Sequence, residues 1–162
     1  MRSPVPSFVR PLKALESIVR KGEDFCAAHK LAPAELLEAR MAPTMKPLTH
    51  QIRLCCNYAT TASMLLSGND AVTVDDAYDT FADLYAKLAE ARKIVAALPD
   101  SVFEDADRII VPVTLDEDPI PYSAHDYLME YAMPNFYFSM TTAYNILRQK
   151  GVPLGKKDFL GV

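Results

Sequence analysis

The sequence predicts an all-α fold, an up-and-down four-helix bundle that carries one short β-hairpin between its third and fourth helices. Two observations lead to this prediction. Apolar residues recur every three or four positions in four long segments, which is the period of an amphipathic helix. β-branched residues alternate in one short segment, which lies between the third and fourth of these. A chain of 162 residues can bury a core without disulfides or metals, so we expect one domain, residues 1–162.

The first long helix is predicted over residues 7–29. Pro11 is compatible with it, because a proline about one turn from the start of a helix loses little hydrogen bonding. A short helix is predicted over residues 33–40, where the proline at its start occupies a favoured position. The proline-containing segment 42–47 then changes the direction of the chain.

The second long helix is predicted over residues 47–66, before a Ser-Gly-Asn turn. Its core-facing stripe consists of Leu48, Ile52, Cys55, Ala59, Ala62 and Leu66. The third helix is predicted over residues 73–98. Thr73 and Asp76 have the capping-box spacing at its start, and Pro99 stops it.

The fourth long helix is predicted over residues 123–150. It begins at Ser123, with Asp126 three residues later, and Gly151 follows its end. Pro134 interrupts the helix once, and we expect a kink there because proline cannot complete the helical hydrogen bonds.

The hairpin is predicted from two strand-like segments, residues 108–115 and 120–122, which flank an acidic turn sequence. Pro112 and Pro121 lack the N–H group that a central strand needs. The pair is therefore confined to a sheet edge or to an isolated hairpin.

Composition and charge exclude several functional classes. The formal net charge is −4 and the sequence has no compact run of lysine and arginine, so we expect no binding of nucleic acid. No apolar segment approaches the ~20 residues that span a bilayer. The first residues lack the apolar region of a secretory signal. We therefore expect a cytoplasmic protein with no membrane partner.

Three cysteines, Cys26, Cys55 and Cys56, do not indicate a disulfide framework. Neighbouring cysteines on a helix point away from each other, so Cys55 and Cys56 could pair only if the backbone were distorted. No C-x-x-C pair is present to suggest zinc. We expect reduced thiols.

The fourth helix carries a polar ridge. At about 100° per residue, Asn135, Ser139 and Thr142 fall on the face that otherwise points to the core. A buried polar group without a partner costs about 1–3 kcal/mol. In one interpretation, Ser139 and Thr142 bond back to carbonyls one turn earlier, and Asn135 satisfies backbone loosened by the proline before it. In the other, the three residues form the polar floor of a ligand pocket.

In the second interpretation, the side chains of Tyr127, Tyr131 and Phe138 form the walls of the pocket. The site would take a small-molecule ligand without a metal or cofactor, for binding or for a simple acid–base reaction. A tyrosine would act as the general acid only if its pKa were shifted. Replacing Ser139 by leucine would then abolish binding while the fold is kept.

The histidines do not form a metal-binding pattern, because no two of His29, His50 and His125 share a helix face. His50 lies roughly 160–200° from the core stripe of its helix, which places it at an edge or a helix–helix seam. We expect no metal site made by the protein alone. A dyad of a histidine with Cys55 or Cys56 is left open, since such a pair needs closeness in space and not in sequence.

Two groups of motifs resemble a known family. The C-terminal group comprises Pro134-Asn-Phe-Tyr-Phe, Thr141-Thr-Ala-Tyr-Asn-Ile-Leu-Arg148, Gly151-Val, Gly155-Lys and Asp158-Phe-Leu-Gly161. The other group comprises Leu36-Leu-Glu-Ala-Arg-Met-Ala-Pro43, Met45 and Pro47-Leu48. Together they resemble the domain-of-unknown-function family 1993, which is placed with the DinB-like four-helix bundles.

The resemblance implies a DinB-like bundle. Better-studied DinB relatives carry a three-histidine metal site, and some act as thiol-dependent transferases or isomerases. At the two helix positions that would supply a pair of ligands, this sequence has Asn135 and Ser139. Members of the family often have histidine where Ser139 stands. Neither an amide nor a neutral hydroxyl is a usual ligand for zinc or nickel.

Three functions stay open at this point. The first is a metal-free small-molecule pocket inside the bundle. The second is a DinB-like metal- or thiol-dependent transferase or isomerase that uses His50, His125 and a cysteine. The third is a non-catalytic structural or interaction protein. Bundles of this kind associate through helix faces, so a homodimer is expected by analogy.

Overall fold

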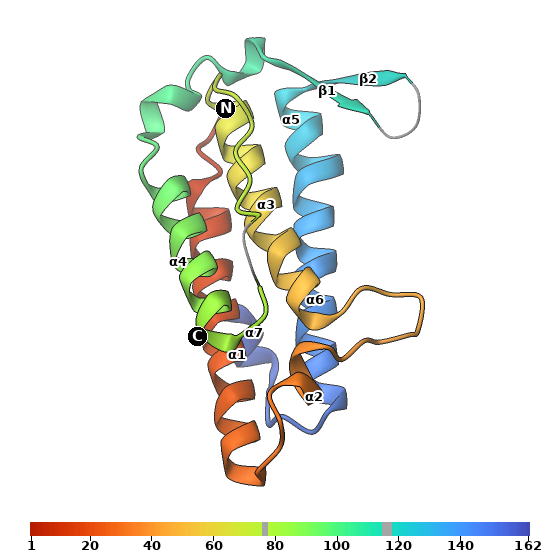
Figure 1. The fold of residues 1–162 in the computed structure, drawn as a ribbon. Helices are drawn as coiled ribbons and strands as arrows, with labels where there is room; N and C mark the ends of the chain where they lie inside the picture. Colours follow the sequence, from red (N-terminus) through yellow and green to blue (C-terminus); the bar gives the residue numbers. More distant parts are fainter. Residues whose placement is uncertain (76–77, 115–117) are drawn as a thin grey trace.

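The computed structural model describes residues 1–75, 78–114 and 118–162. Four long helical segments run side by side, with a hairpin at one end (Figure 1). Three of them are single helices, α1 (Val5–His29), α3 (Leu48–Leu66) and α4 (Phe81–Ala96). The fourth consists of α5 (Ala124–Asp126), a π-helical turn (Tyr127–Ala132) and α6 (Met133–Gln149). The predicted all-α bundle is confirmed. No helix in the described part of the chain is long and apolar enough to cross a membrane.

Helix α3 lies at the centre of the packing. It packs against α4 on one side and against α6 on the other, and α1 packs mainly against α4. Every residue of the apolar stripe predicted for α3 is fully buried. The small members of this stripe, Cys55, Ala59 and Ala62, allow neighbouring helices to approach closely.

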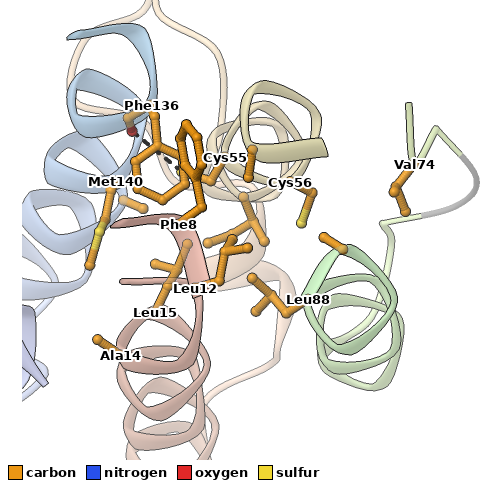
Figure 2. Close-up of a cluster of buried hydrophobic side chains, with 14 of the residues drawn as sticks. Phe8, Leu12, Ala14, Leu15, Cys55, Cys56, Val74, Leu88, Phe136 and Met140 are labelled. Atoms are coloured by element: carbon orange, nitrogen blue, oxygen red, sulfur yellow. Dashed lines mark hydrogen bonds between the residues drawn. The ribbon is translucent and has the colours of Figure 1, made fainter. Parts of the chain in front are cut away.

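The core is centred on two phenylalanine rings, Phe8 of α1 and Phe136 of α6. Their centroids lie 5.3 Å apart and the rings meet edge to face at 75°, an arrangement that aromatic pairs prefer. Both side chains are fully buried. Figure 2 shows Leu12 of α1 and Leu88 of α4 on one side of this pair and Met140 of α6 on the other.

The hairpin pairs β1 (Ile110–Thr114) with β2 (Pro119–Ser123) in antiparallel register, and Pro112 lies opposite Pro121. Neither proline can donate a ladder hydrogen bond, and the described sheet has two strands, as predicted. Of the predicted turn, residues 116–119, the first two lie outside the described residues, and Pro119 begins β2. The remaining short elements are α2 (Ala34–Leu37), α7 (Lys156–Leu160) and two 3₁₀ turns, Asp100–Phe103 and Ala106–Arg108.

The third long helix begins later than the sequence predicts, and the expected start at Thr73 is wrong. Thr73 lies in non-helical chain, and α4 begins at Phe81. The Thr-x-x-Asp spacing occurs a second time, at Thr80 and Asp83, and there it forms the capping box. The Asp83 N–H donates to Thr80 Oγ1 over 3.1 Å, and the Thr80 N–H donates to Asp83 Oδ2 over 2.9 Å. Asp76, the partner in the predicted start, lies outside the described residues.

Polar side chains of α3 hold the segment before α4 in an extended form. This segment, the strap (residues 69–80 apart from 76 and 77), runs beside α3 (Figure 1). Asn57 Oδ1 accepts a hydrogen bond from the Val74 N–H over 2.8 Å, and Thr60 Oγ1 donates to the Val72 carbonyl over 2.6 Å. These bonds give the Val74 N–H and the Val72 carbonyl hydrogen-bond partners outside a helix, so the strap can stay extended.

The fourth helical segment begins as predicted, because Ser123 Oγ accepts from the Asp126 N–H over 3.2 Å. The kink expected at Pro134 takes the form of the π-helical turn directly before it. Proline has no N–H to donate, and its ring crowds the carbonyl four residues earlier. A π turn, whose bonds reach five residues back, widens the helix at this point and relieves the contact.

The C-terminal tail docks on α1. Gly151 has a φ of 94°, which reverses the chain after α6 at the position that the sequence predicts. One carboxylate then fixes the tail: Asp158 Oδ2 accepts from the Gly155 N–H over 2.7 Å, and Asp158 Oδ1 lies 2.6 Å from Lys21 Nζ of α1.

The start of α4 can be tested by removing its cap. Thr80→Ala is expected to lower the free energy of unfolding by about 1 kcal/mol, because the Asp83 N–H loses its acceptor. Urea denaturation followed by circular dichroism measures this. The control Thr73→Ala changes the other Thr-x-x-Asp site, outside the helix, and is expected to cost less than about 0.5 kcal/mol. A larger loss for Thr73→Ala than for Thr80→Ala would contradict the observed start.

Candidate functional site

The polar ridge on α6 lies against the core, with Ser139 and Thr142 buried. The helix itself uses the donors of two of its three members. Asn135 Nδ2 donates to the Tyr131 carbonyl over 2.7 Å, and Thr142 Oγ1 donates to the Phe138 carbonyl over 2.7 Å. These are the backbone bonds of the first interpretation. Neither of these two donors is therefore free for a ligand, and Ser139 is left as the buried hydroxyl of the ridge.

The structure separates the three aromatic residues of the predicted pocket wall. Phe138 is 62% exposed, whereas Tyr127 is 3% exposed and Tyr131 is half-buried. Phe138 therefore does not lie with the two tyrosines.

Four tyrosines gather where the π-helical turn meets α3 and the hairpin. This tyrosine cluster consists of Tyr58 of α3, Tyr122 of β2, and Tyr127 and Tyr131 of the π turn. The ring centroid of Tyr131 lies 5.7 Å from that of Tyr127, 6.3 Å from Tyr58 and 6.5 Å from Tyr122. Sequence reasoning found Tyr127 and Tyr131. It missed Tyr58 and Tyr122, because nothing in the spacing of a single chain shows that distant segments meet.

The hydroxyl groups of the tyrosine cluster make no hydrogen bond with any described residue. Tyr127 is 3% exposed as a residue, but its unpaired hydroxyl oxygen is not among the fully buried atoms and so keeps access to solvent. Burial raises the pKa of Tyr127 to about 12, and the nearby hydroxyls of Tyr131 and Tyr58 raise it further. Burial also raises the pKa of Tyr58. These two phenols keep their protons at neutral pH and can act as hydrogen-bond donors.

The three cysteines are free, buried thiols. Figure 2 shows Cys55 and Cys56 pointing to different sides of α3, and Cys55 Sγ donates to the Phe136 carbonyl over 3.7 Å. Burial raises the pKa of Cys55 well above its ordinary value and that of Cys56 to about 12. Because the thiolate is the reactive form of cysteine, neither side chain is prepared for nucleophilic catalysis.

The histidines lie apart from one another. His29 Nδ1 lies 3.0 Å from the Phe25 carbonyl at the end of α1, and His125 is exposed in α5. His50 is half-buried near the start of α3, with its Nδ1 3.4 Å from Arg53 Nη2. Within the described part of the chain, no hydrogen bond joins a histidine to a cysteine.

A group of basic side chains surrounds an open hollow of about 370 Å³ at the start of α3. This basic hollow is lined by Arg40, Lys46, Pro47, Thr49, His50, Arg53, Tyr78 and Asp79. Sequence reasoning found no basic cluster here, because these residues are separated by the turn at residues 42–47 and by the strap. The turn before α3 and the end of the strap bring them together in space.

A family model described as a domain of unknown function (DUF1993) matches residues 2–160. The chain belongs to the DUF1993 family. The crystal structure of a DinB family member protein from Shewanella denitrificans is similar, with 30% sequence identity and a TM-score of 0.88 over 98% of this chain and 89% of that chain. A search of curated proteins found no match. The family and the fold that the sequence motifs resemble are confirmed.

The metal site of DinB-like relatives does not fit the residues of this DUF1993 chain. The amide nitrogen of Asn135 is held by a backbone carbonyl, and Ser139 offers a neutral hydroxyl. Burial lowers the pKa of His50, and the charges of Arg53 and Lys46 lower it further, so a cation bound there would be repelled. In residues 1–75, 78–114 and 118–162, no group of three or more His, Cys, Asp or Glu side chains is placed to hold a metal ion.

The thiols are expected to be unreactive in the folded protein. At pH 8, a thiol-reactive disulfide reagent should modify Cys55 and Cys56 no faster than the protein unfolds, and all three cysteines should react at once in denaturant. Ser17→Cys adds an exposed thiol on α1 and serves as the fast-reacting control. Rapid modification of Cys55 or Cys56 in native buffer would contradict the burial described above.

The lowered pKa of His50 predicts a pH-dependent stability. Between the folded and unfolded pKa values the unfolded chain binds more protons, so stability from this group is present above pH ~6.5 and is lost as the pH falls. His50→Gln should therefore reduce the loss of unfolding free energy between pH 7.5 and pH 5.5, measured by urea denaturation. His125→Gln, a change of an exposed histidine on α5, serves as the control for removing an imidazole as such. Equal pH dependence in wild type and His50→Gln would rule out this contribution.

Proposed function

We propose that this DUF1993 protein binds a small organic molecule at the tyrosine cluster, without a metal or cofactor. The observation that carries the proposal is the cluster itself, because four tyrosine rings meet around Tyr131 and none of their hydroxyl groups has a hydrogen-bond partner among the described residues. Tyr127 is 3% exposed as a residue, but its hydroxyl oxygen is not among the fully buried unpaired atoms, so a ligand can reach it. A hydrogen-bond acceptor on a ligand would supply the missing partner.

Other residues at or near the tyrosine cluster support this placement. Tyr58, Tyr122 and Tyr131 are half-buried, so their rings offer faces and edges for an aromatic ligand. The side-chain oxygen of Asn135, one turn from Tyr131, has no partner among the described residues and can accept a hydrogen bond from the ligand. Ser139 lies one turn further along α6. Thr142 and Phe138 are left out, because the hydroxyl of the first is used by the helix and the ring of the second is exposed.

The proposed activity is binding and not acid–base catalysis. A general acid works best when its pKa is near the working pH. The pKa of Tyr127, raised to about 12 by burial, is far above neutral pH. Tyr127 then serves as a hydrogen-bond donor that keeps its proton. The homodimer and the cytoplasmic location expected from the sequence stay predictions.

Tyr127→Phe tests the proposal because it removes the hydroxyl and keeps the ring. The ligand-free variant should keep its free energy of unfolding within about 0.5 kcal/mol, since no protein hydrogen bond is lost. Neutral aromatic fragments that carry a carbonyl acceptor are screened against wild type by ligand-observed NMR. Fragments that bind should lose about fivefold or more in affinity to Tyr127→Phe, which corresponds to one hydrogen bond of about 1 kcal/mol.

Tyr144→Phe is the matched control. The Tyr144 hydroxyl accepts from Arg148 over 3.2 Å, outside the tyrosine cluster, so this variant should keep wild-type affinity. Ser139→Leu should also weaken binding if the ligand reaches the second turn of α6. The proposal fails if no fragment binds wild type, or if the fragments bind Tyr127→Phe as tightly as wild type.

A further inference from the structure

The basic hollow has walls that the protein fixes by its own hydrogen bonds. Arg40 Nη1 donates to the Met45 carbonyl over 2.7 Å, which anchors this side chain to the turn before α3. The Tyr78 hydroxyl, also at the hollow, donates to the Val74 carbonyl over 2.8 Å and anchors the ring to the strap. The hollow is therefore formed before any ligand arrives.

Two backbone N–H groups at the start of α3 have no acceptor among the described residues. Pro47 is the N-cap residue and has no side-chain oxygen to offer. The Gln51 N–H reaches the Pro47 carbonyl over 3.1 Å, but the N–H groups of Thr49 and His50 have no acceptor among the described residues. Both residues line the hollow. Free N–H groups and the positive end of the helix dipole favour an anion at this position.

The charges around the hollow are mostly positive. Arg40, Lys46 and Arg53 line it, and none of them forms an ion pair with a described residue. Asp79 is the one acid among the described residues that line it. The charges of Arg53 and Lys46 also act on His50, as its lowered pKa indicates. An anion would relieve the repulsion between these groups.

Arg53 adds an independent indication of a missing partner. Its Nε atom is buried and has no hydrogen-bond partner among the described residues. A guanidinium group presents donors in a rigid fork that matches the oxygens of a phosphate or carboxylate. Because Nε is buried, a ligand oxygen in the hollow would meet Arg53 at its terminal Nη groups, one of which lies 3.4 Å from His50 Nδ1.

We propose that the basic hollow binds the phosphate group of a small phosphate monoester. The phosphate oxygens accept hydrogen bonds from the N–H groups of Thr49 and His50 and from the side chains of Lys46 and Arg53. A volume of about 370 Å³ falls within the ~300–1,000 Å³ of small-molecule sites, so the hollow has room for the organic part of the ester. That part lies against the ring of Tyr78. This site goes beyond the proposed function and shares no residue with the tyrosine cluster.

The test is a titration of the full ¹⁵N-labelled chain with inorganic phosphate and then with phenyl phosphate, at constant ionic strength set with chloride. Saturable shifts are expected at the amide signals of Thr49 and His50 and at the Arg53 Nε signal. Phenyl phosphate should bind more tightly than inorganic phosphate, because its ring contacts Tyr78. Absence of saturation, or shifts of equal size over the whole surface, would overturn the proposal.

Charge-neutralising variants distinguish binding at the basic hollow from nonspecific electrostatic attraction between phosphate and the protein surface. Lys46→Gln combined with Arg53→Gln should weaken phenyl phosphate binding at least tenfold. Arg108→Gln combined with Lys150→Gln changes the net charge equally at exposed positions away from the hollow and should keep wild-type affinity. If Arg53→Gln disturbs the fold, Lys46→Gln alone still tests the proposal, because Lys46 is exposed and its replacement should not affect folding. This single variant is expected to bind phenyl phosphate about threefold more weakly than wild type. Equal losses in the two double variants, or none in the first, would overturn the proposal.

The two proposals can fail separately. Tyr127→Phe leaves the basic hollow unchanged and should bind phenyl phosphate like wild type. If this variant loses phosphate binding together with fragment binding, the two sites are not independent and the placement of the phosphate in the basic hollow is wrong.

Discussion

The structure depends on α3 being covered on three sides at once. Its apolar stripe is buried between α4 and α6, while the side chains of Asn57 and Thr60 form hydrogen bonds with the backbone of the strap. A helix can meet such different neighbours because its side chains leave the axis at steps of about 100°. Helix α3 also contributes residues to both candidate sites: Tyr58 to the tyrosine cluster, and His50 and Arg53 to the basic hollow. Any change that rotates α3 would therefore disturb the core, the strap and both sites together.

Pro134 imposes the second constraint. A regular helix cannot run through it unchanged, and the π-helical turn before it is the local solution. The extra residue in this turn changes the direction of every side chain that precedes α6, including the stacked rings of Tyr127 and Tyr131. The Asn135 amide then returns to the Tyr131 carbonyl at the end of the same turn. The stacked tyrosine pair and the bond of Asn135 thus both lie at the turn that precedes this proline.

Particular residues show how far sequence reasoning reached. The stripe of α3, the cap at Ser123, the end at Gly151 and the two-stranded hairpin were all predictable, because each depends on neighbours within a few residues. The start of α4 was not, because two Thr-x-x-Asp motifs offer the same local signal. The choice of Thr80 over Thr73 follows from the hydrogen bonds that α3 gives to the strap. For the site, Tyr127, Tyr131, Asn135 and Ser139 were found from one helix, whereas Tyr58 and Tyr122 were not.

The sequence by itself determined the fold class, the family and which faces of the long helices are buried, since these follow from periodicity and from motifs along the chain. Only the tertiary structure decided which polar groups are satisfied and which are left open. It gave Asn135 and Thr142 backbone partners, left the hydroxyl of Tyr127 and the Nε of Arg53 without partners among the described residues, and assembled Arg40, Lys46 and Arg53 around one hollow. The physical reason is that hydrogen bonds and charges act over a few ångströms in space, between residues whose separation in sequence carries no information about that distance.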